Sequence, residues 1–96
     1  MKPMEQTTYV YITLCSDGSF YTGVAKDIEK RLAQHNSGRG AKYTSSRRPV
    51  KLRFLETCPS LSVALKRERQ IKRMRRVQKE ALVLGGKRLP KKFRSL

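Results

Sequence analysis

Two short segments on either side of a turn sequence constrain the fold most. Apolar and polar residues alternate from Tyr9 to Leu14, and strand-forming residues resume from Phe20 to Val24. A period of two is typical of half-buried strands. The residues between them, Ser16-Asp17-Gly18-Ser19, favour a turn. We therefore predict a β-hairpin, with the even-numbered residues of its first strand facing the core.

The tyrosines set the register of this hairpin. Opposed residues of an antiparallel pair have a constant index sum, so Tyr11 and Tyr21 share a face only if the loop has an odd number of residues. We predict a loop of three or five residues, which places Tyr21 opposite Thr13 and diagonal to Tyr11. Both phenols would then reach one site.

A short helix is expected after the hairpin. Asp27 is a good N-cap residue, Ile28–Asn36 has helical spacing, and Gly38 is suited to end the helix. Arg31 and His35 lie four positions apart and therefore share one helix face. This face borders the apolar stripe that packs on the core.

The next part of the chain predicts a loop, a strand and two helices. Ser37–Pro49 is rich in glycine, hydroxyl groups and cations and has no sustained period, so we expect an exposed loop. Val50–Thr57 alternates again, which predicts a third strand with its even-numbered residues on one face. A long helix from just after Pro59 to about Arg75 and a shorter one over Gln78–Leu84 should follow.

The fold class that these elements predict is α/β (α+β), with a central three-stranded sheet, mixed or antiparallel, flanked by helices. A chain of 96 residues has room for one small domain. We place this domain at residues 1–86 and expect Lys87–Leu96 to be a mobile basic tail. Cys15 and Cys58 form neither a disulfide framework nor a zinc-binding pattern.

The charge of the chain indicates its class of partner. Twenty-three Lys and Arg residues against seven Asp and Glu give a formal net charge of +16. Nucleic acid is the expected partner. A basic membrane-surface peptide is the competing interpretation, but the basic segments lack the apolar stripe that would anchor them in a bilayer. Without a signal peptide or a long apolar run, we expect the protein in the cytoplasm. The sequence leaves the oligomeric state open, with a monomer favoured.

Four residues in ordered positions carry the candidate chemistry. Tyr21 follows Tyr11 by ten positions, and Arg31 follows Tyr21 by ten. Glu68 falls in the apolar stripe of the long helix, where a carboxylate needs a partner. From the residues alone, Glu68 either serves a site or forms an i,i+4 pair with Lys72. The tyrosines either serve that site or only pack their rings on the strands.

Taken together, these residues resemble the GIY-YIG nuclease superfamily. The resemblance is carried by Tyr9-Val10-Tyr11, Tyr21-Thr22-Gly23, Arg31 and Glu68, and it spans roughly Tyr9 to Leu84. The compact layout resembles that of small single-domain bacterial members of unassigned function. The first tripeptide differs from the family name at two positions and the second at its middle one. Many members also carry an asparagine on the terminal helix, where this chain has Gln78, Lys79 and Glu80.

The resemblance implies roles for the four residues. Tyr21 would act as general base toward the attacking water, with Tyr11 beside it, and Arg31 would hold the scissile phosphate. Glu68 would bind one divalent ion, Mg²⁺ or Mn²⁺. A positioned guanidinium and a metal both stabilise the charge that develops on phosphate oxygens during cleavage.

Further residues are candidates for contact with the substrate. His35 either assists proton transfer and touches phosphate or is a surface histidine. The cations that we expect at the nucleic-acid surface, against the alternative of solvated charge, are Lys26, Arg39, Lys42, Arg47, Arg48, Arg69 and Lys72. Tyr43 and Phe93 lie among cations and are candidates for base stacking.

The implied function is metal-dependent hydrolysis of phosphodiester bonds, preferably of DNA, on branched, damaged or single-stranded substrates. The alternative from another class is a non-catalytic basic module that binds DNA or associates with RNA or the ribosome by counterion release. A third alternative is a recruitment subunit of a repair assembly.

Overall fold

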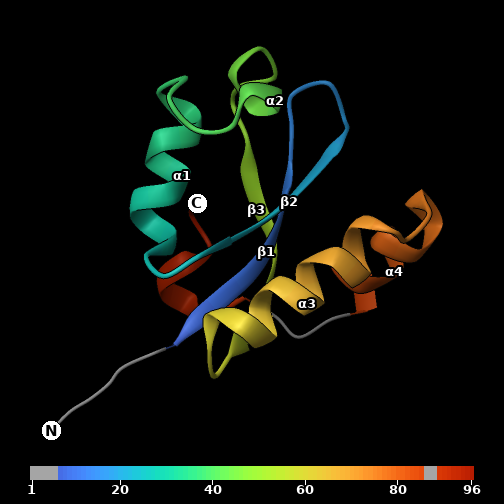
Figure 1. Ribbon diagram of the computed structural model, residues 1–96. Coiled ribbons are helices and arrows are strands. Elements are labelled where there is room, and N and C mark those ends of the chain that lie inside the picture. The colour runs from blue at the N-terminus through green and yellow to red at the C-terminus, as the bar shows by residue number, and fades with distance from the viewer. Residues whose placement is uncertain (1–6, 86–88) are drawn as a thin grey trace, which may run out of the picture.

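The protein is a three-stranded antiparallel sheet with helices on both faces (Figure 1). The computed structural model describes residues 7–85 and 89–96. Strand β1 (Thr8–Leu14) lies in the middle, between β2 (Phe20–Ala25) and β3 (Lys51–Cys58). The predicted three-stranded sheet and its flanking helices are confirmed, and both strand pairs are antiparallel.

The register of the β1–β2 hairpin is as predicted from the tyrosines. The loop between the strands has five residues, Cys15–Ser19, and Tyr21 pairs with Thr13. Gly18 supplies the positive φ of +85° that the turn needs. As a result, the rings of Tyr11 and Tyr21 lie on the same face, with their centroids 6.4 Å apart.

Helix α1 (Ile28–Asn36) covers one face of the sheet. The Asp27 carboxylate caps it by accepting a hydrogen bond from the Lys30 backbone N–H at 3.0 Å, and Gly38 follows its end with a φ of +87°. The predicted bounds of this helix are confirmed. The buried apolar cluster under it consists of Tyr11, Cys15, Ile28, Leu32, Val50, Leu52 and Phe93.

Helices α3 (Leu61–Lys72) and α4 (Arg76–Gly85) lie on the opposite face (Figure 1). Ser60 caps α3 by accepting the Val63 N–H at 3.2 Å, but α3 ends three residues before the predicted Arg75. The buried cluster here consists of Val10, Ile12, Phe54, Cys58, Ala64 and Ile71. None of the helices in residues 7–85 and 89–96 has the length and apolar character that crossing a membrane requires.

The apolar stripe predicted for α3 is only partly correct. Ala64 and Ile71 are buried, but Leu61 and Leu65 are 49% and 37% exposed. The stripe of α3 that is buried against the sheet is therefore narrower than the apolar pattern of its sequence indicates. Its leucine side chains border the side on which Glu68 lies, because residues three, four and seven positions apart share a helix face.

Two expectations about the faces of the strands are wrong. The central strand β1 is buried on both faces, since Tyr11 and Thr13 are 0% exposed as well as the even-numbered residues Val10 and Ile12. A β-bulge in the β1–β3 pair shifts the register between Ile12 and Thr13. It turns Leu52 toward the α1 side and leaves Phe54 on the α3 side.

The predicted exposed loop contains a structured segment. Helix α2 (Lys42–Ser45) is a single turn, and the chain after it is fastened to the hairpin loop, because the Ser16 N–H donates to the Arg47 carbonyl at 2.9 Å. Thr44, on α2, is 0% exposed. The segment 37–49 thus packs against the face of the sheet that carries Tyr11 and Tyr21.

The expectation of a mobile C-terminal tail is wrong for Leu89–Leu96. A 3₁₀ turn, Lys91–Phe93, places the Phe93 ring in the core at 5% exposure, 6.2 Å from the ring of Tyr9. The Leu52 N–H also donates to the Leu96 carbonyl at 3.0 Å. The domain therefore includes these residues, while Gly86, Lys87 and Arg88 lie outside the described ones.

The buried hydroxyl of Thr22 leads to a prediction about stability. Its side chain is 4% exposed, and its hydroxyl oxygen has no hydrogen-bond partner among the described residues. Because an unsatisfied buried hydroxyl costs free energy, we expect Thr22→Val to raise the free energy of unfolding by about 1 kcal/mol. Urea unfolding measures this change.

Thr13 provides the matched control for this prediction. It is equally buried on the neighbouring strand, but its hydroxyl donates to the Tyr21 carbonyl at 3.4 Å. Thr13→Val should therefore lower the free energy of unfolding, by about 0.5–1 kcal/mol. A Thr22→Val protein less stable than the native one would contradict the claim that the Thr22 hydroxyl is unsatisfied.

Candidate active site

The site is built around the buried hydroxyl of Tyr11. Tyr11 is 0% exposed and lies directly opposite Gly23 of β2. A Cβ atom at position 23 would lie 2.6 Å from the Tyr11 hydroxyl and 2.8 Å from its Cζ atom, which is closer than side chains pack. Glycine is thus required here by the close approach of the phenol.

A chain of hydrogen bonds fixes the proton of this phenol. The Thr44 hydroxyl donates to the Ala41 carbonyl at 3.0 Å, so it must accept the N–H of His35 Nδ1, 2.8 Å away. The other nitrogen of a neutral His35, Nε2, is then an acceptor, and the Tyr11 hydroxyl donates to it at 2.8 Å. Tyr11, His35 and Thr44 form a buried relay.

The ionisation of the relay follows from its burial. Burial raises the pKa of Tyr11 to about 12, against the opposing hydrogen bond and charge of Arg31. Burial also lowers the pKa of His35 to about 4, and the nearby Arg31 charge adds to this shift. Both groups are therefore neutral near pH 7. His35 is 0% exposed, so the alternative of a surface histidine is wrong, and so is the expectation that its ring touches phosphate.

Arg31 links the two tyrosines. Burial alone would lower the pKa of its guanidinium, but hydrogen bonds and charge from Tyr11 and Tyr21 outweigh burial and raise that pKa. Its Nη1 also donates to the Gln34 side chain at 3.2 Å. Arg31 is half-buried, so its guanidinium contacts both phenols and keeps part of its surface exposed.

Glu68 approaches the same phenol from α3. Its charge acts on Tyr11, raising the pKa of that hydroxyl. The side chain is 16% exposed and forms an ion pair with Lys72 at 3.3 Å, so the i,i+4 pair expected as an alternative is present. The structure therefore brings Tyr11, Tyr21 and Arg31 together, with His35 behind them, and places Glu68 within range of an electrostatic effect on Tyr11.

The donor set fits a magnesium-like ion held by one residue. The other ion-paired carboxylates in the described ranges lie elsewhere: Asp17 with Arg47, Glu56 with Arg67 and Glu80 with Arg76. No group of three or more His, Cys, Asp or Glu side chains suited to a metal occurs in that part of the chain. Mg²⁺ keeps several waters and commonly binds through one carboxylate plus substrate phosphate, so Glu68 suffices.

The terminal helix adds no ligand to this site. Gln78 accepts the Arg75 backbone N–H at 2.8 Å and so caps the start of α4. Glu80 pairs with Arg76, whose guanidinium lies 4.0 Å from the centroid of the Phe20 ring and donates to the Gly18 carbonyl. Arg76 thus connects α4 to the hairpin, while Gln78 and Glu80 bond within or next to the helix.

The predicted nucleic-acid-binding cations fall into two groups. Four are exposed and form no ion pair with a described acid: Lys26, Arg39, Lys42 and Arg69. The other three have partners within the protein. Lys72 pairs with Glu68, Arg47 pairs with Asp17 at 3.0 Å, and Arg48 donates to backbone carbonyls.

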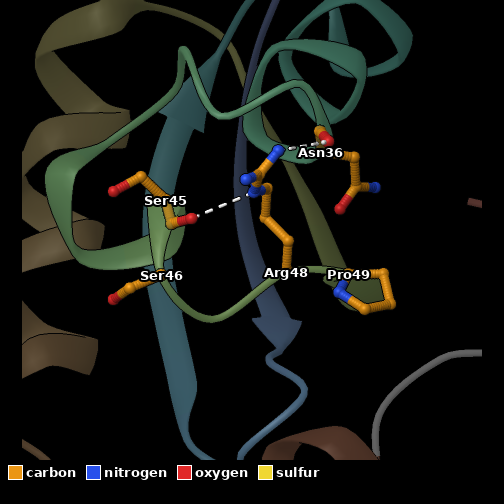
Figure 2. Close-up of a pocket in the computed structure, with 5 residues that line it drawn as sticks. All are labelled: Asn36, Ser45, Ser46, Arg48 and Pro49. Carbon is orange, nitrogen blue, oxygen red and sulfur yellow. Dashed lines mark hydrogen bonds between the residues drawn. The ribbon is translucent and has the colours of Figure 1, made fainter.

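Arg48 lies in a shallow pocket of about 480 Å³ away from the phenols. Figure 2 shows its guanidinium between the carbonyls of Ser45, at 2.9 Å, and Asn36, at 3.5 Å, with Ser46 and Pro49 completing the wall. These carbonyls belong to the ends of α1 and α2. Arg48 therefore stabilises the segment that holds Thr44 against His35.

Several residues of the site carried no signal in the sequence. Thr44 lies nine positions after His35, a spacing that neither a helix nor a strand turns into a contact. The segment around it also has no hydrophobic periodicity. Gly40 is needed because a Cβ there would overlap the His35 side chain and lie 2.8 Å from its Cα atom. Of the residues proposed for base stacking, Phe93 is in the core, and the Tyr43 ring stacks on Tyr21.

The lowered pKa of His35 predicts how stability depends on pH. Between its usual value of 6.5 and about 4, the unfolded chain binds a proton on this imidazole that the native protein does not. Stability is therefore present above pH 6.5 and is lost as the pH falls to 4, by about 3 kcal/mol for this group. His35 is the single histidine, so proton NMR of its ring reads the native pKa directly. Titration near 6.5 would contradict the buried relay.

Comparison with known proteins identifies a family model, relatives and a solved structure that resemble this chain. Residues 7–81 match the family model described as the GIY-YIG catalytic domain. A UPF0213 protein of Syntrophus aciditrophicus is 62% identical over 76 residues, 78% of this chain and 87% of that protein. A UPF0213 protein of Staphylococcus saprophyticus is 55% identical over 78 residues, 81% and 95% of the two chains. The solution NMR structure of a protein from E. faecalis aligns with a TM-score of 0.59 at 43% identity, covering 84% of this chain and 86% of that one.

Proposed function

The chain belongs to the GIY-YIG family, and from this premise we propose that it is a divalent-metal-dependent endonuclease that hydrolyses phosphodiester bonds, of DNA in preference to RNA. The observation that supports the proposal most is the convergence of four side chains from four elements. Tyr11 comes from β1, Tyr21 from β2, Arg31 from α1 and Glu68 from α3. Together they offer a general base, an anion-binding group and a metal ligand.

Tyr21 is the phenol that meets the substrate in this proposal. It is half-buried, whereas Tyr11 is 0% exposed. In this step the phenolate form of Tyr21 takes a proton from the attacking water and becomes a phenol, while the water oxygen forms a bond to phosphorus. The bond from phosphorus to the leaving oxygen breaks, and that oxygen takes a proton from solvent. The Arg31 guanidinium binds the non-bridging oxygens of the scissile phosphate. The charge that develops on those oxygens strengthens the hydrogen bonds from Arg31 in the transition state.

Tyr11 and His35 act as positioning residues. The Tyr11 proton is committed to His35 Nε2, so the lone pairs of the phenol oxygen remain free to accept from Arg31. The buried relay therefore holds the guanidinium in place before the substrate binds. This pre-organisation is what makes a charged group effective in catalysis.

Glu68 holds the metal ion in this proposal, with phosphate oxygens and waters as the other ligands. The bound ion would stabilise the departing oxygen and the charged phosphate. The Glu68 charge acts on the Tyr11 hydroxyl, which supports placing the ion on the side of the phosphate that faces α3. The exposed cations Lys26, Arg39 and Lys42 attract the nucleic-acid strand on either side of the scissile phosphate, because its phosphates are negatively charged.

A cleavage assay tests the proposal. Purified protein is incubated with supercoiled plasmid, single-stranded and branched oligonucleotides, and RNA, in Mg²⁺, in Mn²⁺ and in chelator. We expect cleavage with either ion and none in chelator. Tyr21→Phe, which removes only the hydroxyl, should lower the single-turnover rate by at least about 100-fold.

Tyr9→Phe is the matched control for this variant. Tyr9 lies on β1 two residues from Tyr11, and its ring packs on Phe93, away from the proposed phosphate position. It should cut at the native rate. If Tyr21→Phe also cuts at the native rate, the general base is wrong; if no substrate is cut, the protein is a basic nucleic-acid-binding module.

A further inference from the structure

Tyr21 is joined to a second aromatic residue that the catalytic roles above do not use. The Tyr43 ring stacks on the Tyr21 ring, with centroids 6.1 Å apart and planes 25° from parallel. Tyr43 is 40% exposed and lies on the single-turn helix α2. A ring on so short an element needs other contacts to stay in place.

Arg47 supplies these contacts. Its guanidinium carbon lies 3.9 Å from the centroid of the Tyr43 ring, and its Nη1 donates to the Tyr43 carbonyl at 2.8 Å. Its Nε donates to the Asp17 carboxylate at 3.0 Å, and its own carbonyl accepts the Ser16 N–H at 2.9 Å. Arg47 thus connects the ring of Tyr43 to the loop of the hairpin that carries Tyr21.

These contacts leave Arg47 with little capacity for phosphate. Its Nε is used by Asp17, one Nη by a backbone carbonyl, and its planar face lies over an aromatic ring. The positive charge is also offset by the Asp17 carboxylate. A planar guanidinium that stacks and forms hydrogen bonds at its edge cannot be replaced by a lysine, although lysine keeps the charge.

The geometry points to Arg47 and Tyr43 as positioning residues that orient the ring of Tyr21 for its role as general base. The inference rests on the proposed function. The Tyr21 ring also contacts the rings of His35 and Tyr11, with centroids 5.1 Å and 6.4 Å away, so Tyr43 adds a third aromatic contact to it. Displacing a reacting group by about 1 Å costs on the order of 100-fold in rate.

Kinetics of Arg47→Lys separate positioning from phosphate binding. The variant keeps the charge but loses the stack, so we expect kcat to fall by about 10-fold or more with KM within about 2-fold of native. Tyr43→Leu should behave in the same way, and Tyr43→Phe, which keeps the ring, should recover most of the rate. Lys51→Met, on an exposed cation of β3, is the control for loss of charge.

The opposite pattern would overturn the inference. If Arg47 binds phosphate, Arg47→Lys keeps the native kcat, whereas Arg47→Met raises KM. If Tyr43→Leu and Arg47→Lys both retain the native kcat, neither residue positions the general base.

A spectroscopic measurement tests the inference apart from cleavage. The chain has four tyrosines and no tryptophan, so a 3-fluorotyrosine-labelled protein gives four resolvable ¹⁹F signals, with that of Tyr21 identified by Tyr21→Phe. In Arg47→Lys the Tyr21 signal should shift toward that of the free amino acid, while the Tyr9 signal stays in place. An unmoved Tyr21 signal refutes the positioning even if the protein proves to be no nuclease, and a moved signal with no cleavage refutes only the proposed function.

Discussion

Replacing Glu68 by glutamine is expected to abolish metal-dependent cleavage while leaving nucleic-acid binding intact. Glutamine keeps the shape of the side chain and removes the negative charge that would hold the ion. A bound metal contributes several kcal/mol to the stabilisation of the transition state, so we expect the single-turnover rate to fall by about 1,000-fold or more. Affinity measured by fluorescence anisotropy should not fall, because the variant carries one negative charge fewer.

The chain offers a matched control for this variant. Glu80 forms an i,i+4 pair with Arg76 at 3.1 Å, comparable to the pair of Glu68 with Lys72, but on α4. Such pairs contribute at most about 1 kcal/mol to stability. Glu80→Gln should therefore cut within about 2-fold of the native rate. Native cleavage by Glu68→Gln would show that Glu68 serves only its ion pair.

Gly23→Ala is expected to disable the site through a single methyl group. The added Cβ would lie 2.6 Å from the Tyr11 hydroxyl, so the phenol must move away from His35 Nε2. We expect a loss of about 1–3 kcal/mol in the free energy of unfolding, because the ring is fully buried. The cleavage rate should fall by about 100-fold, since Arg31 loses its fixed partner.

A second substitution tests the steric origin of this effect. In Gly23→Ala/Tyr11→Phe the closest atom is absent, so part of the lost stability should return while cleavage stays low. Gly85→Ala serves as control, because a Cβ there meets nothing within 4 Å. A Gly23→Ala protein with native stability and native activity would refute the close packing of the Tyr11 hydroxyl against position 23.

The sequence was sufficient for those features that are decided by neighbouring residues. An odd loop length follows from placing both tyrosines on one face, and the five-residue loop agrees with it. The cap Asp27 fixes the start of α1 because its side chain accepts a nearby backbone N–H. The shared face of Arg31 and His35 follows from helical spacing.

Features decided by distant parts of the chain could not be predicted. The bulge that separates Leu52 from Phe54 depends on pairing with β1, which the alternation within β3 does not reveal. The role of Thr44 depends on its hydrogen bond with His35, and no local sequence pattern predicts this bond. The burial of Phe93 depends on contacts with Tyr9 and with the core cluster under α1, which are distant in the sequence. The local sequence around it is rich in cations and therefore resembled a free tail.

The account makes one central claim, that Tyr21 and Glu68 act on the same phosphate as parts of one site. Groups that act as a unit have non-additive effects on rate. The most direct test is therefore the single-turnover cleavage rate of Tyr21→Phe, of Glu68→Gln and of the double variant, measured in Mg²⁺ at saturating protein. The account predicts that the double variant is slower than the slower single variant by no more than about 3-fold. Rate losses that multiply in the double variant would contradict a shared site, as would native cleavage by either single variant.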